Sequence, residues 1–193
     1  MFLPALASIS AKKSTLLQAL LLLLLVGLFS ACGGNEEDYY RNPCSPSASE
    51  RETQKVADIK TIKAYFRKNG VDTTNMQETA SGIHYVVLTP GTGAQVKTGN
   101  RVEVHYIGKH LCDDLSSSSC TFDSSYGRGT TFPFTVGANQ VIKGWDEALP
   151  LMQVGEEARF YIPSYLAYGP CGSGTSINGN ENLVFDIKVI SAK

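Results

Sequence analysis

Polar and apolar residues alternate along much of the chain after Ser81, and a period of two is typical of strands with one buried face. Within Arg101–Ile107 this alternation places Val102, Val104 and Tyr106 on a common face. Similar patterns predict further strands at His84–Leu88, Phe132–Val136, Glu157–Pro163 and Asn182–Ile190. Polar or Gly-rich segments separate them, including the long loop Ser164–Glu181. The pattern therefore predicts a fold in which strands dominate.

A helical period precedes the strands. Residues spaced by three and four predict a helix over Glu50–Asn69, with an apolar face formed by Val56, Ile59, Ile62, Tyr65 and Phe66. Ser49 and Glu52 fit a capping box at its start, and Gly70 fits its end. The stripe leaves open whether this helix packs on the domain or pairs with a second copy. We expect the following segment, Val71–Ala80, to be a loop.

A shorter helix of about two turns is predicted at Trp145–Met152, where Pro150 distorts or ends it. Trp145 is the one tryptophan of the chain, and on the residues alone it belongs either to a core or to the floor of a pocket. Strands with a single short helix among them predict an α+β fold, in which an antiparallel sheet has its apolar face covered by that helix.

The first 31 residues are predicted to be a signal peptide rather than part of the fold. Lys12 and Lys13 precede the apolar run Leu16–Phe29, which is too short to span a bilayer as a helix. Small residues and then Cys32 follow, and this arrangement resembles a bacterial lipoprotein signal. The resemblance implies that Cys32 is acylated and anchors the chain in the bacterial cell envelope, at the outer membrane on its periplasmic or surface side. An ordinary signal peptide with a chance cysteine is the alternative.

Residues 32–49 are predicted to form a flexible tether, because the segment is polar and contains prolines. Acidic residues at Glu36, Glu37 and Asp38 resemble a surface-export signal of lipoproteins in the Bacteroides group, and a solvated linker explains them equally well. The predicted organisation is thus a signal peptide (1–31), a tether (32–49), a helical extension (50–80) and a domain (81–193).

The composition of the chain supports one folded domain with additional segments. Its 193 residues are 42% hydrophobic and 18% charged, which is enough apolar material for a core. The net charge of −1 shows no basic excess, so nucleic acid is not an expected partner.

Five cysteines occur, and four remain if Cys32 carries lipid. An even number of cysteines in an exported chain predicts disulfides, with three possible connectivities. Cys112 and Cys120 flank a short polar loop and are the expected pair, which leaves Cys44 with Cys171. A metal site is the alternative, but the chain has no CxxC motif and its histidines are scattered, so no metal is expected.

Six short blocks, in order, give the chain a family resemblance. They are Val104-His105-Tyr106-Ile107-Gly108, Phe122-Asp123-Ser124-Ser125, Phe132-Pro133-Phe134 with Gly137, Val141-Ile142-Lys143-Gly144-Trp145-Asp146-Glu147, Ile162-Pro163-Ser164 through Ala167-Tyr168-Gly169, and Leu183-Val184-Phe185-Asp186. In these blocks Ser81–Lys193 resembles the FKBP-type peptidyl-prolyl cis-trans isomerases. The resemblance implies a strongly bent antiparallel sheet, a half-barrel, wrapped around the short helix.

The resemblance also implies a site between helix and sheet, without a cofactor. Four residues would have catalytic roles: Tyr106, Asp123, Ile142 through its backbone N–H, and Tyr168 through its hydroxyl. Trp145 would form the floor, and the other substrate-binding residues would be Phe122, Arg128, Phe132, Val141, Ile177 and Phe185. Arg128 would either pair with Asp123 or remain a solvated charge.

The residue types suit this chemistry. Rotation about an X–Pro bond is slow because amide resonance must be broken, at a barrier of roughly 20 kcal/mol. The twisted amide is less polar than the planar one, so an aromatic pocket that excludes water favours it relative to water. Hydrogen-bond donors to the flanking carbonyls help if their bonds strengthen in the transition state. No proton transfer or nucleophile is required.

We therefore expect an exported, lipid-anchored isomerase that acts on proline-containing polypeptides, with macrolides as possible ligands. A peptide-binding chaperone module with little catalysis and a surface lipoprotein acting in adhesion are the alternatives. Three departures from the family pattern surround the pocket rim, one of which is Cys171-Gly172-Ser173-Gly174, a segment that adds flexibility or, if crosslinked, restraint. Lys109–Thr121 is long and carries a cysteine pair, and Ile177-Asn178-Gly179 replaces the common Ile-Pro-Pro, which predicts a more mobile loop.

Overall fold

The computed structural model describes residue 42 and residues 44–193. The predicted signal peptide, Cys32 and much of the predicted tether lie outside the described residues. Within this described part, none of the helices has the length and apolar character needed to cross a membrane.

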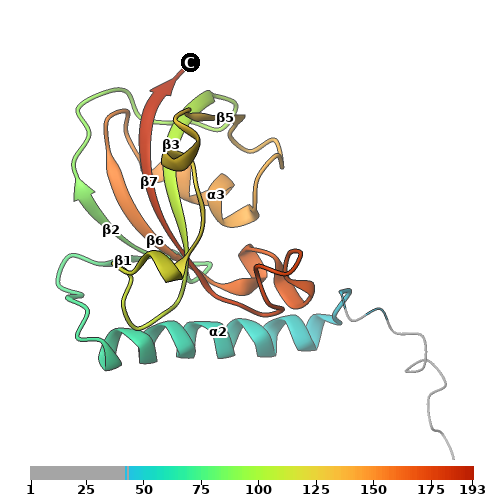
Figure 1. Ribbon diagram of the computed structural model, residues 1–193. Coiled ribbons are helices and arrows are strands. Elements are labelled where there is room, and N and C mark those ends of the chain that lie inside the picture. Colours follow the sequence, from blue (N-terminus) through green and yellow to red (C-terminus); the bar gives the residue numbers. More distant parts are fainter. Residues whose placement is uncertain (1–41, 43) are drawn as a thin grey trace, which may run out of the picture. The chain divides into compact units, whose positions relative to one another are not determined.

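An antiparallel sheet of seven strands forms the centre of the described part (Figure 1). Its strands are β1 (Gln77–Glu78), β2 (His84–Thr89), β3 (Arg101–His110), β4 (Thr121–Ser124), β5 (Phe132–Thr135), β6 (Glu157–Ile162) and β7 (Leu183–Ala192). They are ordered β1-β2-β6-β7-β3-β4, and β5 pairs with β3. The predicted strands are all present, and the predicted loop 71–80 contains the additional short strand β1, which pairs with β2.

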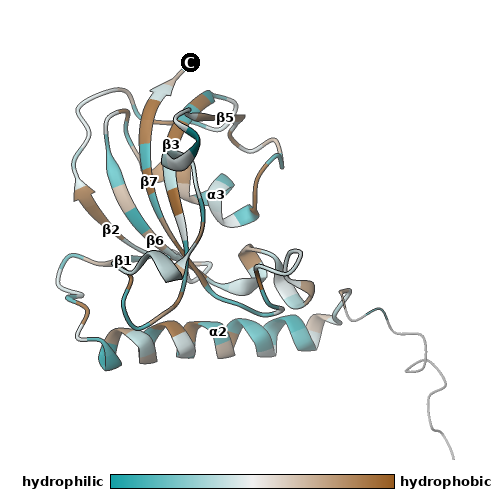
Figure 2. Cartoon of the chain, viewed as in Figure 1, coloured by the Kyte–Doolittle hydropathy of each residue, from teal (hydrophilic) through white to brown (hydrophobic). Residues whose placement is uncertain are grey.

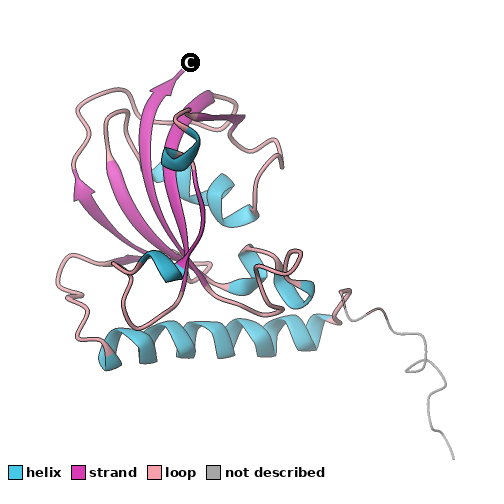
Figure 3. Cartoon of the chain, viewed as in Figure 1, coloured by secondary structure: helices cyan, strands magenta, loops and turns pink. Residues whose placement is uncertain are grey.

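Strand β3 explains how the sheet bends. Its first half pairs with β5 and its second half with β4, while β7 follows it along its whole length. Register shifts between Glu103 and Val104 and between Gly108 and Lys109 mark local irregularities of the kind that bend a strand. The curved sheet wraps around the short helix α3 (Lys143–Ala148), as Figure 3 shows. The α+β half-barrel that the resemblance implied is confirmed.

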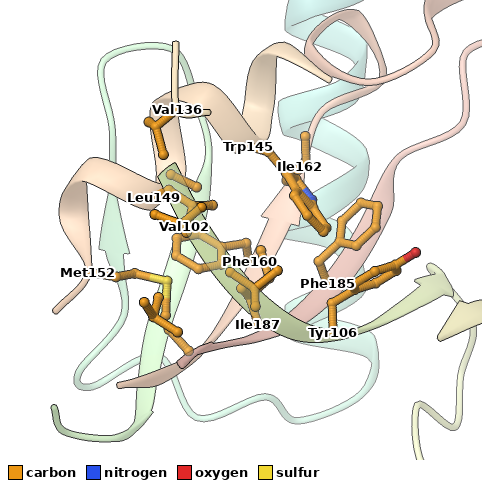
Figure 4. Packing of buried hydrophobic residues seen from close by; sticks show 14 of the residues in the cluster. Val102, Tyr106, Val136, Trp145, Leu149, Met152, Phe160, Ile162, Phe185 and Ile187 are labelled. Carbon is orange, nitrogen blue, oxygen red and sulfur yellow. The ribbon is translucent and has the colours of Figure 1, made fainter. Parts of the chain in front are cut away.

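Helix α3 begins earlier and ends earlier than predicted. The α-helix stops at Ala148, and a 3₁₀ turn at Leu149–Leu151 contains Pro150. Proline has no backbone N–H and crowds the preceding turn, so the regular helix ends before it. Leu149 and Met152 are fully buried in the main core, where residues of β3, β6 and β7 such as Val102, Phe160 and Ile187 are also buried (Figure 4).

The long helix α2 (Ala48–Lys68) lies across one end of the sheet (Figure 1). It packs on the domain through a second core cluster, in which Ile62, Tyr65 and Phe66 are buried with Tyr161 and Val184. Of the two alternatives for the apolar face of α2, packing on the domain is the one that the structure shows. Figure 2 shows that hydrophobic and hydrophilic residues are interspersed along the helix.

Two details of the α2 prediction are wrong. The capping box is formed by Ser47 and Glu50, one pair earlier than predicted, because both Ser-x-x-Glu pairs fit the motif and the helix already begins at Ala48. Val56 is 61% exposed, whereas Asp58 is buried. At 3.6 residues per turn, Val56 lies about 120° around the helix from Ile62 and Asp58 only about 40° away.

Two disulfides join cysteines of the described residues. Cys112 is joined to Cys120, and Cys44 to Cys171, which are the pairs that the sequence suggested. The first closes the polar segment between β3 and β4. The second ties the start of α2 to the loop before β7.

Candidate functional site

A cavity of about 240 Å³ lies between helix α3 and the concave face of the sheet. Aromatic and branched side chains from β3, β4, β5, β7 and α3 surround it, together with residues of the loop before α3 and Tyr168 from the loop before β7. Its lining residues are Tyr106, Phe122, Asp123, Phe132, Gln140, Val141, Ile142, Trp145, Tyr168 and Phe185.

Trp145 forms the apolar centre of this pocket. Its side chain is 4% exposed, and its ring meets those of Tyr106 and Phe185 edge to face, at centroid distances of 5.0 and 5.3 Å (Figure 4). Edge-to-face pairs of this kind stabilise an aromatic cluster beyond the area they bury. The indole Nε1 is buried and has no hydrogen-bond partner in the described residues. The ring of the indole lines the pocket with apolar surface.

A glycine allows two of the aromatic walls to approach each other. Phe122 and Phe185 meet edge to face at 5.7 Å across Gly108. A Cβ on Gly108 would lie 2.7 Å from the Phe122 ring and 2.9 Å from the Phe185 ring. Both distances are too short for real carbon contacts, so this wall needs glycine in β3.

Three side chains joined by hydrogen bonds form the polar side of the pocket. The Tyr106 hydroxyl donates to Asp123, and Arg128 donates through Nη1 to Asp123 Oδ1 at 2.5 Å and through Nη2 to the Tyr106 oxygen at 2.8 Å. Of the two alternatives for Arg128, pairing with Asp123 is the correct one. The guanidinium carbon also lies 5.6 Å from the centre of the Tyr106 ring, within cation–π range.

These contacts set the charges of the group. Burial alone would raise the pKa of Asp123, but hydrogen bonds from Tyr106 and Arg128 outweigh it and hold that pKa below its usual value. Burial, together with the bond to Asp123, raises the pKa of Tyr106. At neutral pH Asp123 is therefore a carboxylate and Tyr106 a neutral donor.

Two donors remain available to a bound chain. Ile142 is the N-cap residue of α3, with φ −60° and ψ 149°, and its backbone N–H has no acceptor among the described residues. Tyr168 is 39% exposed, and within the described part its hydroxyl makes no hydrogen bond. Burial and the negative charge of Asp123 raise the pKa of Tyr168, so its hydroxyl keeps its proton at neutral pH.

The structure brings nearly all the predicted site residues together. Of the eleven, Arg128 contacts lining residues without lining the cavity itself, and Ile177 is apart. Ile177 is 6% exposed and packs in the main core. Its segment turns back on itself, with Ser173 N donating to Ile177 O at 2.9 Å, and this turn directs Ile177 inward.

Gln140 is a lining residue that sequence reasoning missed. Its Oε1 accepts a hydrogen bond from Thr135 N at 2.9 Å, which ties the end of β5 to the segment that carries Val141 and Ile142. Its position directly before Val141 was the available signal. A polar side chain drew no attention in a search for apolar walls.

Comparison with known proteins points in one direction. The family described as "FKBP-type peptidyl-prolyl cis-trans isomerase" matches residues 93–190. FK506-binding protein 1 of Saccharomyces cerevisiae is 43% identical over 104 residues, 53% of this chain and 86% of the relative. FKBP-type peptidyl-prolyl cis-trans isomerase FkpA of Aeromonas hydrophila is also 43% identical, over 130 residues, 67% of this chain and 43% of the relative.

The fold is similar as well. The crystal structure of FkpA from Escherichia coli matches with a TM-score of 0.59 and 29% sequence identity, over 75% of this chain and 63% of that one. This chain thus spans less than two thirds of either FkpA protein, but most of the smaller yeast relative.

Proposed function

The chain belongs to the family of FKBP-type peptidyl-prolyl cis-trans isomerases, and we propose that the Trp145 pocket is its catalytic site and exported proteins are its substrates. The observation that supports the site is the meeting, in one cavity, of an aromatic floor with two unpaired donors and a fixed carboxylate. In this proposal Tyr106, Asp123, Ile142 and Tyr168 are the catalytic residues.

The mechanism follows from the polarity of the pocket. A proline ring entering the cavity would contact the Trp145 face and displace water from the amide that precedes it. The amide loses charge separation as it twists, so an apolar surround favours the twisted state relative to water. The Ile142 N–H and the Tyr168 hydroxyl would donate to carbonyl groups of the peptide and keep it in a turn, and this lowers the barrier where the bonds strengthen on twisting.

Asp123 has a supporting role in this mechanism. Its carboxylate accepts from both Tyr106 and Arg128, and so it fixes the ring of Tyr106 against Trp145. None of the three groups needs to change protonation during the reaction. The rate of isomerisation should accordingly be nearly constant with pH around neutrality.

A kinetic comparison of single variants tests the site. Tyr168→Phe removes one donor and should lower kcat/KM roughly 2- to 10-fold, the range expected for one hydrogen bond. Asp123→Ala frees Tyr106 and Arg128 and should lower kcat/KM about 3-fold or more, a modest loss because the pair is partly solvated. Leu88→Ala is the matched control: this β2 residue is 46% exposed and outside the pocket, so activity should stay within about twofold. Full activity in both pocket variants would refute the site.

We propose further that the protein acts in the bacterial envelope, held there by a lipid on Cys32. The sequence pattern before Cys32 supports this, and so do two disulfides, which persist in oxidising compartments. Metabolic labelling with a palmitate analogue tests the anchor. Wild type should carry label and enter the detergent phase, whereas Cys32→Ser should do neither. Equal labelling of Cys32→Ser would contradict the lipoprotein assignment.

Macrolides are proposed as ligands of the same pocket, since the yeast relative is named for binding FK506. Trp145, the single tryptophan, reports on occupancy directly. FK506 should change its fluorescence in a saturable way and inhibit isomerisation with the same midpoint. Inhibition without any change in fluorescence would place the ligand elsewhere.

A further inference from the structure

Helix α2 contributes one carboxylate to the interior of the domain. Asp58 is 2% exposed, although acidic side chains are rarely buried without partners. It does not line the Trp145 pocket. We propose that Asp58 is a positioning residue for the isomerase reaction, which acts from α2 by holding the loop that carries Tyr168. The inference rests on the proposed role of Tyr168 in the pocket.

The contacts of Asp58 are directed at the start of that loop. Asp58 Oδ2 accepts from the Ser164 hydroxyl at 2.7 Å and from the backbone N–H of Tyr165 at 3.4 Å. Asp58 Oδ1 accepts from Gln54 Nε2 at 2.7 Å, which fixes the carboxylate on its own helix. Ser164 is fully buried, and its N–H donates to Asn182 Oδ1 at 3.0 Å. Hydrogen bonds therefore hold the loop in place where it leaves β6.

A single turn connects the hydrogen-bonded residue Ser164 to Tyr168. Ser164–Leu166 is a 3₁₀ turn, closed by the Ala167 N–H donating to Ser164 O at 2.9 Å. Tyr168 is the next residue. A rotation at Ser164 would thus be carried directly to Tyr168, with little chain between them to absorb it.

Packing alone does not fix the loop on its helix side. A cavity of about 480 Å³ separates the first half of α2 from the loop, and it is lined by Pro46, Glu50, Arg51, Thr53, Gln54, Tyr165, Gly169, Pro170 and Asn180. Where side chains do not close-pack, bonds must set the position of the chain. The Asp58 hydrogen bonds and the Cys44–Cys171 disulfide both connect the α2 side of this cavity to the loop.

The same turn is joined to the floor of the pocket. The Tyr165 hydroxyl donates to the carbonyl oxygen of Ser81, and the Ser81 hydroxyl donates to Glu147. Glu147 belongs to α3, the helix that carries Trp145. Asp58 is thus linked to both the Tyr168 side and the Trp145 side of the pocket.

The charge of Asp58 argues against a purely structural role. Burial raises the pKa of Asp58, and the hydrogen bonds from Ser164 and Gln54 only partly offset this. A buried carboxylate whose desolvation is not fully offset is a poor source of stability, and an apolar side chain often serves a packed position better. The carboxylate instead serves as the hydrogen-bond acceptor that holds Ser164 and Tyr165 in position.

The test measures kcat, KM and thermal stability of the full chain carrying Asp58→Ala, Asp58→Asn or Ser164→Ala. Asp58→Ala should lower kcat/KM roughly 2- to 10-fold in the folded protein, no more than removal of the Tyr168 hydroxyl itself, because it acts by misplacing that group. Asp58→Asn should keep most of the activity, because its oxygen can still accept from Ser164 while Gln54 turns its carbonyl to the new amide. If Asp58→Ala does not fold, Ser164→Ala tests the same contact.

Two further readouts separate positioning from general damage. Amide hydrogen exchange in Asp58→Ala should rise at residues 164–168 and not in β3. In a Tyr168→Phe background, Asp58→Ala should have less than half its effect on log(kcat/KM), because both changes act on one group. Lys63→Ala, which breaks an exposed contact of α2 with Glu78, is the control and should leave activity unchanged.

The outcomes are distinct. If Tyr168→Phe and Asp123→Ala lose activity while folded Asp58→Ala matches wild type, the Asp58 inference is wrong and the site stands. The inference also fails if Asp58→Ala has the same effect with and without the Tyr168 hydroxyl. If the pocket variants are fully active, the proposed site itself is wrong, and the inference falls with it.

Discussion

Replacing Phe66 by alanine tests how helix α2 is held on the domain. Phe66 is 6% exposed and meets Tyr161 edge to face at 4.7 Å and His84 at 5.4 Å. Phe→Ala in a core typically costs about 3–5 kcal/mol. Phe66 also borders a surface cavity of about 320 Å³, so its surroundings can relax and the lower end applies. We expect a loss of about 3 kcal/mol in the free energy of unfolding, or roughly 6–12 °C in Tm.

Urea unfolding followed by Trp145 fluorescence is a suitable assay, because Trp145 belongs to the main core and reports on the domain rather than on α2. The matched control is Val56→Ala in the same helix, where the side chain is 61% exposed and the expected change is below about 0.5 kcal/mol. Equal midpoints for the two variants would show that the Val56 and Phe66 faces of α2 contribute alike to stability, contrary to this prediction. A change of less than about 1 kcal/mol for Phe66→Ala would show that the helix is not integrated with the domain.

Two further predictions concern the pocket wall and the sheet. Gly108→Ala should push two aromatic rings of the pocket apart, raise KM several-fold and cost about 1–3 kcal/mol, whereas Gly127→Ala, which meets open space, should change neither KM nor Tm. Asp186 is largely buried between Arg159 and Lys109, with its side chain 11% exposed. Although burial would raise its pKa, the hydrogen bonds from these two cations hold that pKa below its unfolded value of 3.8. This contribution to stability is complete above about pH 4 and is lost as the pH falls through the lower folded pKa, so Asp186→Asn should flatten the acid limb of a stability curve. An unchanged acid limb in that variant would contradict the assignment.

The sequence was most informative where the pattern is local. Alternation along Arg101–Ile107 predicted which side chains of β3 are buried, because in a strand the face of a residue depends only on its parity. The resemblance then supplied the pocket, and nearly all its predicted residues line or touch one cavity. The Asp123–Arg128 pair could only be an open alternative, since it depends on a turn that brings the two side chains together.

The failures concern residues whose environment is decided by tertiary contacts. Val56 and Asp58 were misjudged because the buried face of the helix was predicted from hydrophobicity alone. A carboxylate can be buried where hydrogen-bond donors such as the Ser164 hydroxyl are available to it. Ile177 was expected at the rim, but a turn in its loop directs it into the core. Gln140 was missed because a polar side chain can line an apolar cavity when its own amide is bonded elsewhere.

Exchange spectroscopy on an X–Pro peptide decides whether the Trp145 pocket catalyses isomerisation or only binds peptide. A catalytic amount of the wild-type protein should accelerate exchange between the cis and trans peptide signals without changing their populations. The double variant Asp123→Ala with Tyr168→Phe should reduce this acceleration at least about sixfold, the product of the smallest losses expected for the two single changes. Peptide binding that shifts the Trp145 fluorescence while exchange remains at the uncatalysed rate would contradict the account, and it would make the pocket a binding site rather than a catalytic one.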